Sequence, residues 1–104
     1  MPLKRLVLSL GLCLVSGTPN WAQAADAAQG QRIAERWCAA CHVVSRAQTR
    51  GFAAVPSFHE IARRYQLSGT RLSLFLADPH PKMPDMQLSQ SEIADLVAYI
   101  RSQR

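Results

Sequence analysis

The sequence predicts an all-α fold of four short helices joined by two long irregular segments. Apolar residues recur at intervals of three and four in four separate stretches, as they do on the buried face of an amphipathic helix. No stretch alternates apolar and polar residues in the manner of a half-buried strand. Residues that cap or break helices bound these stretches. At 104 residues the chain is one domain at most.

The first expected helix covers residues 27–37. Asp26 is a good N-cap, and Gln29 stands three residues later, as in a capping box. Gly30 lies inside this helix at a cost of about 1 kcal/mol relative to alanine. A glycine is useful there if another helix crosses at that point, and an incidental glycine is the alternative. The apolar face would consist of Ile33, Ala34 and Trp37.

Three further helices follow. The second covers residues 57–65 and is preceded by Pro56, the third is opened by Ser68 and ended by Pro79, and a Ser89-Gln90-Ser91-Glu92 capping box opens the fourth. Their inward residues would be Phe58, Ile61, Ala62 and Tyr65 in the second, Leu72, Phe75 and Leu76 in the third, and Ile93, Leu96, Val97 and Ile100 in the fourth. The irregular segments 43–55 and 79–88 are long for so small a domain, which favours loops that wrap a flat cofactor.

The N-terminal segment 1–24 has the pattern of a secretory signal peptide. Lys4 and Arg5 precede an uncharged run over residues 6–15, and Ala22-Gln23-Ala24 supplies a small-x-small cleavage site. Ten apolar residues span only about 15 Å, roughly half of a hydrocarbon core, which argues against a membrane anchor. We therefore expect export to the periplasm, an oxidising compartment, and a mature domain of residues 25–104.

One motif, Cys38-Ala39-Ala40-Cys41-His42, dominates the mature segment. This C-x-x-C-H pattern is the attachment signature of c-type haem. Each thiol can add across one haem vinyl group, and the adjacent imidazole then lies under the iron as an axial ligand. The motif predicts one covalently bound haem c per chain.

Three other uses of the two cysteines fit the sequence less well. A thioredoxin-like dithiol follows a β-strand, and no strand is expected before Cys38. Zinc needs four ligands, for which only His59 and His80 remain. A disulfide between Cys38 and Cys41 would close a loop too short to constrain the unfolded chain much.

For the sixth iron ligand the chain offers Met83, Met86, His59 and His80. Met83 lies in Pro81-Lys82-Met83-Pro84, where no helix face accounts for it and the prolines restrict the backbone. Met86 is nearer to the last helix and could simply pack against it. His59 is interpreted as a surface residue. Met83 is the favoured ligand.

The mature segment closely resembles a class I cytochrome c over essentially its whole length. The shared features are a glycine eight residues before the first cysteine, the haem motif, a proline after the first loop, a methionine in a proline-rich loop, and an aromatic residue in the last helix; here these are Gly30, residues 38–42, Pro56, Met83 and Tyr99. The chain departs from the family in its short loop before Pro56. It also has Ala34 where the family commonly has an aromatic residue, whose bulk Trp37 could supply.

The resemblance implies a cytochrome c fold around one haem, with the first and last helices crossing at Gly30, opposite Leu96 and Tyr99. The carbonyl of Pro56 would accept a hydrogen bond from His42 Nδ1–H and leave Nε2 for the iron. The family's ligand methionine lies about sixteen residues before the aromatic residue of the last helix, a count that reaches Met83 from Tyr99.

The predicted function is one-electron transfer in the periplasm by haem c with His42 and Met83 as axial ligands, and not enzymatic catalysis. The alternatives are a haem c subunit dedicated to a periplasmic dehydrogenase or oxidase, and a sensor or peroxidase with an open sixth position. The net charge of +5 favours acidic redox partner proteins. A nucleic-acid partner is not expected because the basic residues are scattered. Stable membrane insertion after signal removal is not expected either, and the protein would be a monomer or a subunit of a redox complex.

Overall fold

A computed structural model describes residues 17, 24–64, 68–78 and 83–104 of the chain. Within these residues it contains four α-helices and no strand, so the predicted all-α fold is confirmed. The helices are α1 (Ala27–Trp37), α2 (Phe58–Arg64), α3 (Gly69–Ala77) and α4 (Gln90–Ser102). Nearly all of the predicted signal peptide 1–24 lies outside the described residues, as do Tyr65, Pro79 and His80.

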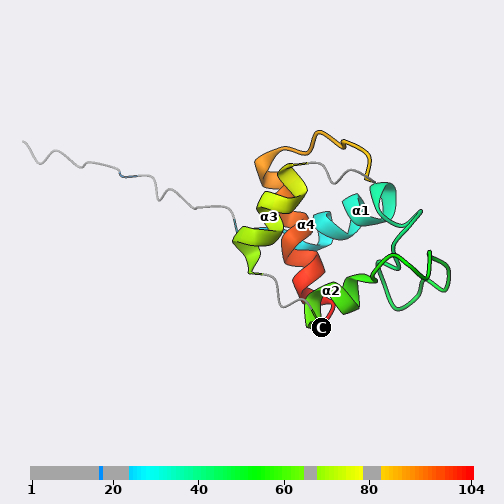
Figure 1. The fold of residues 1–104 in the computed structure, drawn as a ribbon. Coiled ribbons are helices and arrows are strands. Elements are labelled where there is room, and N and C mark those ends of the chain that lie inside the picture. Colours follow the sequence, from blue (N-terminus) through cyan, green and yellow to red (C-terminus); the bar gives the residue numbers. More distant parts are fainter. Residues whose placement is uncertain (1–16, 18–23, 65–67, 79–82) are drawn as a thin grey trace, which may run out of the picture.

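The last helix, α4, is the centre of the fold. Each of the other three helices packs against it, and α1 makes by far the most extensive of these contacts. Figure 1 shows α1 crossing behind α4, α3 lying along the opposite side, and α2 near the C-terminal end of α4. Because α4 is an apolar-faced helix shared by three neighbours, it supplies the largest part of the buried core: Ile93, Leu96, Val97, Tyr99 and Ile100.

The start of α1 differs from the predicted capping box. The carboxylate of Asp26 accepts hydrogen bonds from the backbone N–H groups of Ala28 (2.9 Å) and Gln29 (3.2 Å), as expected of an N-cap. In a complete capping box, the side-chain oxygen of Gln29 would also accept the backbone N–H of Asp26. This bond is missing because that oxygen accepts from Arg32 instead. Asp95 of α4 takes its place, since its Oδ1 accepts the backbone N–H of Asp26 at 2.7 Å.

The third and fourth helices begin as predicted. Ser68 Oγ accepts the backbone N–H of Arg71 at 3.2 Å and so caps α3. At α4 the capping box is complete: Ser89 Oγ accepts from the Glu92 N–H at 3.2 Å, and the Glu92 carboxylate accepts from the Ser89 N–H at 2.7 Å. No helix within the described residues is long and apolar enough to cross a membrane.

The helices α1 and α4 cross at Gly30. A Cβ on this residue would fall on the backbone carbonyl of Asp95 and come within 2.8 Å of Tyr99 Cβ. The crossing at Gly30 that the family resemblance implies is therefore present, and Asp95 is the residue in closest contact there. Only glycine allows the two backbones to approach this closely, which offsets its cost to the helix.

Two predicted core residues are in fact largely exposed. Trp37 is 41% exposed and lies beside the guanidinium of Arg36, with 5.2 Å between the Arg36 Cζ and the ring centroid. It lies on the same face as Gly30 but two helical turns beyond the crossing. Phe75 is 47% exposed because Leu72 and Leu76, one turn apart, form the face of α3 that packs inward.

We predict that Gly30→Ala destabilises the protein by about 2 kcal/mol or more, because the added methyl group forces α1 away from the Asp95 carbonyl. Thermal unfolding would register this as a Tm decrease of about 8 °C or more. Gly69→Ala is the matched control, since a Cβ there meets the mobile end of Arg101 at 3.2 Å and not a backbone. Equal Tm values for the two variants would contradict the crossing.

Candidate functional site

The Cys38–His42 motif forms a tight turn directly after α1. The N–H groups of Cys38 and Ala39 both donate to the Ala34 carbonyl (2.8 and 3.0 Å), so the motif begins as a continuation of the helix. The N–H groups of Cys41 and His42 then donate to the Cys38 carbonyl at 3.1 and 2.9 Å. The turn therefore brings the second cysteine and the histidine back towards the first.

The two thiols of the motif have different surroundings. Cys38 is 6% exposed and belongs to the hydrophobic core, whereas Cys41 is exposed, and no disulfide joins them. Burial raises the pKa of the Cys38 thiol to about 11. The site of Cys38 thus favours an uncharged sulfur, which is the state of a thioether as well as of a protonated thiol.

The imidazole of His42 is oriented by the loop that follows. Its Nδ1 lies 2.6 Å from the carbonyl oxygen of Pro56 and donates to it, since a carbonyl can only accept. This hydrogen bond fixes the tautomer and leaves a lone pair on Nε2. Among the described residues Nε2 has no hydrogen-bond partner. The geometry that the family resemblance implies for His42 and Pro56 is present in the structure.

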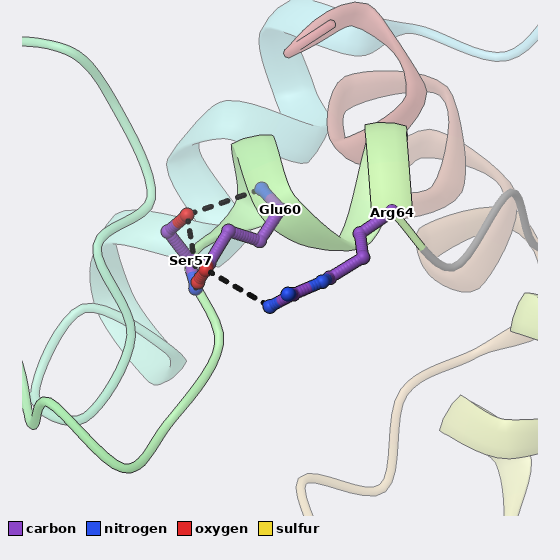
Figure 2. A network of polar contacts seen from close by, with 3 residues as sticks. All are labelled: Ser57, Glu60 and Arg64. Carbon is purple, nitrogen blue, oxygen red and sulfur yellow. Dashed lines mark hydrogen bonds and ion pairs between the residues drawn. The ribbon is translucent and has the colours of Figure 1, made fainter.

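A second capping box fixes the chain directly after Pro56. Figure 2 shows Ser57 just before α2, Glu60 in its first turn, and Arg64 at its end reaching back towards Glu60. The Glu60 carboxylate accepts the Ser57 N–H at 3.0 Å, and Ser57 Oγ accepts the Glu60 N–H at 3.1 Å. Arg64 approaches the same carboxylate at 4.0 Å, but this ion pair is solvent-exposed and contributes little. The capping box fixes the backbone of Ser57. It thereby also fixes the neighbouring carbonyl of Pro56, which orients His42.

Three aromatic rings connect the motif to α4. The rings of His42 and Phe58 have centroids 5.6 Å apart, and Phe58 packs edge-on against Tyr99 at 6.2 Å. The buried Tyr99 hydroxyl donates to the Val44 carbonyl at 2.7 Å. Burial, with a smaller contribution from the charge of Glu35, raises the pKa of Tyr99 and keeps this donor protonated. The central helix thus holds the backbone two residues beyond His42.

The structure distinguishes the residues considered as a sixth ligand. Met86 is half-buried and packs against the core, and Met83 is half-buried without belonging to that core cluster of the described residues. Between Met86 and Leu88 the chain turns through Gln87, whose φ is 50°, and its N–H donates to Asp85 Oδ1 at 3.0 Å. In Figure 1 this segment arches over the helices from Met83 towards α4.

The structure describes one of the two histidines other than His42. His59 is exposed, as interpreted from the sequence, and its Nδ1 donates to the Gln103 carbonyl at 2.7 Å. His80 lies outside the described residues. In the part of the chain that the structure describes, no three histidine, cysteine or acidic side chains cluster to hold a metal ion.

Comparison with known proteins agrees with the motif. A sequence model of the family described as cytochrome C oxidase, cbb3-type, subunit III, matches residues 25–100. Cytochrome c-552 of Bradyrhizobium diazoefficiens is 50% identical over 97 residues, which are 90% of this chain and 93% of that protein. The chain belongs to the c-type cytochromes. No solved structure matches it.

As a c-type cytochrome, the chain carries covalently bound haem c and is an electron carrier. The residues present fit that cofactor: two unpaired thiols are spaced as C-x-x-C-H, and the neighbouring imidazole has its Nε2 available. When bound, haem c supplies a one-electron iron couple. The chain's own residues hold the group, orient the imidazole and exclude water from it.

Two features of the site were missed in the sequence. The capping box of Ser57 and Glu60 has a recognisable Ser-x-x-Glu signature, which could have been found beside Pro56. The other is Gln48, which makes four hydrogen bonds to the backbone around the motif. No pattern marks this residue, because a single glutamine in a polar loop reads as solvated.

We predict that Tyr99→Phe lowers the free energy of unfolding by about 1–3 kcal/mol, because the buried Val44 carbonyl loses its donor while the ring packing is retained. Urea unfolding of the haem-loaded protein measures the change. Ser102→Ala removes an exposed hydroxyl that donates to the Tyr99 carbonyl, and it should change stability by less than about 0.5 kcal/mol. Equal stability of Tyr99→Phe and the unmodified protein would contradict the role of this hydrogen bond.

Proposed function

We propose that the protein is a periplasmic one-electron carrier whose haem is attached at Cys38 and Cys41 and ligated by His42 and Met83. The observation that carries this proposal is the 2.6 Å hydrogen bond from His42 Nδ1 to the Pro56 carbonyl. It presents Nε2 as a ligand in a fixed tautomer, and a carbonyl acceptor makes that nitrogen more basic. A histidine with a purely structural role has no need of this arrangement next to two cysteines.

Two observations support ligation by Met83: its own position and the location of Met86. The side chain of Met86 is used in packing against the core, whereas Met83 lies in a proline-flanked segment outside the core cluster of the described residues. A thioether ligand favours Fe(II) and raises the reduction potential. With two protein ligands the iron has no open position for oxygen or a substrate, so the protein transfers electrons and does not catalyse a reaction on a substrate.

Periplasmic location is proposed from the N-terminal segment. Residues 1–24 have the pattern of a signal peptide, and the family match begins at residue 25, where the mature domain would start. Removal of Lys4 and Arg5 with that segment leaves 10 basic and 7 acidic residues, a net charge of +3. The redox partners would then be proteins with an acidic docking face.

A second candidate is a haem c subunit that serves a single oxidase or dehydrogenase. The description of the matching family as an oxidase subunit favours it. The chemistry at the iron is the same in both cases, and only the permanence of the partner differs. Co-purification of the protein from its native membrane in stoichiometric complex with an enzyme would support the subunit, and recovery as a separate redox-active protein supports the carrier.

We predict that the mature protein, produced with haem-attachment machinery, has the mass of residues 25–104 plus one haem after denaturation. The reduced protein should not change its optical spectrum under carbon monoxide, because both axial positions are occupied by protein ligands. Absence of the haem increment would refute covalent attachment. A carbon monoxide spectrum at neutral pH would instead support the sensor or peroxidase interpretation.

We predict that Met83→Ala abolishes the weak near-infrared sulfur-to-iron(III) band of the oxidised protein, while Met86→Ala keeps it. Met86→Ala should instead lower stability by about 2 kcal/mol or more, because it removes a side chain that packs against the core. Loss of the band only in Met86→Ala would reverse the assignment. A protein without the band before any substitution would have no methionine ligand.

A further inference from the structure

The side chain of Gln48 makes contacts that the electron-transfer function does not by itself explain. Its Nε2 donates to the carbonyls of Ala39 (2.9 Å), His42 (2.7 Å) and Arg50 (2.6 Å). Its Oε1 accepts the backbone N–H of Val44 at 3.0 Å. Two of these partners lie inside the haem motif and two in the loop that follows it. We propose that Gln48 is a positioning residue for the axial ligand His42.

The arrangement suits an amide and no other uncharged side chain. An amide nitrogen has two hydrogens, so three carbonyl acceptors saturate it, with one hydrogen shared. The oxygen of the same amide supplies the acceptor that the Val44 N–H needs. A glutamate would place an acceptor opposite three carbonyl oxygens. An apolar side chain would leave the part-buried backbone groups of Ala39, His42 and Val44 without this partner.

The other backbone groups of this stretch are held by different parts of the chain. The Cys41 carbonyl accepts from the Phe52 N–H (3.0 Å), and the Val43 carbonyl accepts from the Phe58 N–H (2.9 Å). For the His42 carbonyl, Gln48 is the hydrogen-bond partner that the described residues provide. His42 is thus held at its ring by Pro56 and at its backbone by Gln48. Loss of the hydrogen bond from Gln48 allows His42 to rotate. This rotation lengthens the hydrogen bond between the His42 ring and the Pro56 carbonyl.

Gln48 also affects the charge distribution beside the ligand. Three carbonyl oxygens converge on its Nε2, and their partial negative charges are compensated by the amide hydrogens. Without this compensation, the carbonyls and the water that replaces the amide stabilise the more positive, oxidised iron. Substitution of Gln48 should therefore lower the reduction potential. This step rests on the proposed ligation of the iron by His42.

The test compares Gln48→Glu and Gln48→Met with two controls in the haem-loaded protein. Gln48→Glu keeps the size of the side chain and removes donation, whereas Gln48→Met removes both donation and acceptance. Gln31→Met controls for loss of an exposed glutamine on α1, and Val97→Ala controls for a general loss of stability in the core. The readouts are the reduction potential and the exchange rate of the His42 Nδ1 proton, measured by NMR in the reduced state.

We expect the His42 Nδ1 proton to exchange at least tenfold faster in both Gln48 variants than in Val97→Ala. We also expect the reduction potential to be lower in both Gln48 variants than in the unmodified protein, and lower in Gln48→Glu than in Gln48→Met. In the unmodified protein, the Gln48 side-chain amide protons should exchange much more slowly than those of Gln31. Because this measurement needs no variant, it tests the proposal even if neither Gln48 variant accumulates. Exchange rates and potentials equal to those of Val97→Ala, or Gln48 amide protons as labile as those of Gln31, would overturn the proposal. Failure of the haem assignment would appear separately, as an unmodified protein without the haem mass.

Discussion

The fold depends on the close crossing of α1 and α4 at Gly30. Asp95 joins α4 to α1 in two places. Its backbone carbonyl lies against Gly30, and its carboxylate accepts the N–H of Asp26. The position of α1 along α4 is thereby set at the N-cap of α1 and at the end of its first turn. Since the haem motif follows α1 without a break, the same crossing determines where Cys38 enters the core.

The motif is held by groups that come from distant parts of the chain. The central helix reaches it through Tyr99, whose hydroxyl binds the Val44 carbonyl, and the start of α2 reaches it through Pro56 and Phe58. The intervening loop contributes Gln48. Long irregular segments are costly in conformational entropy for so small a domain. In the loop between His42 and Pro56, backbone groups are used to orient a single imidazole, which accounts for the length of this loop without regular structure.

The sequence could predict the elements whose determinants are local. The caps at Ser68 and at Ser89 with Glu92 are set by residues three positions apart, and they were found as expected. The predicted role of Gln29 in a capping box was wrong, because Asp95, which is distant in sequence, accepts the backbone N–H of Asp26. Trp37 and Phe75 have helical periodicity, but their burial depends on where the neighbouring helices lie, which spacing along one helix does not specify. Gln48 could not be predicted, because its importance lies in carbonyls that converge only after folding.

The surroundings of the motif contain dipoles and no buried charges, which suits a carrier that exchanges one electron. The structure has no buried charged side chain among the described residues, and the ion pair between Glu60 and Arg64 is exposed. A change of one unit in iron charge would then act on neutral groups already fixed by hydrogen bonds: the Pro56 carbonyl, the Gln48 amide and the Tyr99 hydroxyl. Fixed dipoles need little reorganisation when the charge changes, and this keeps the two oxidation states close in structure.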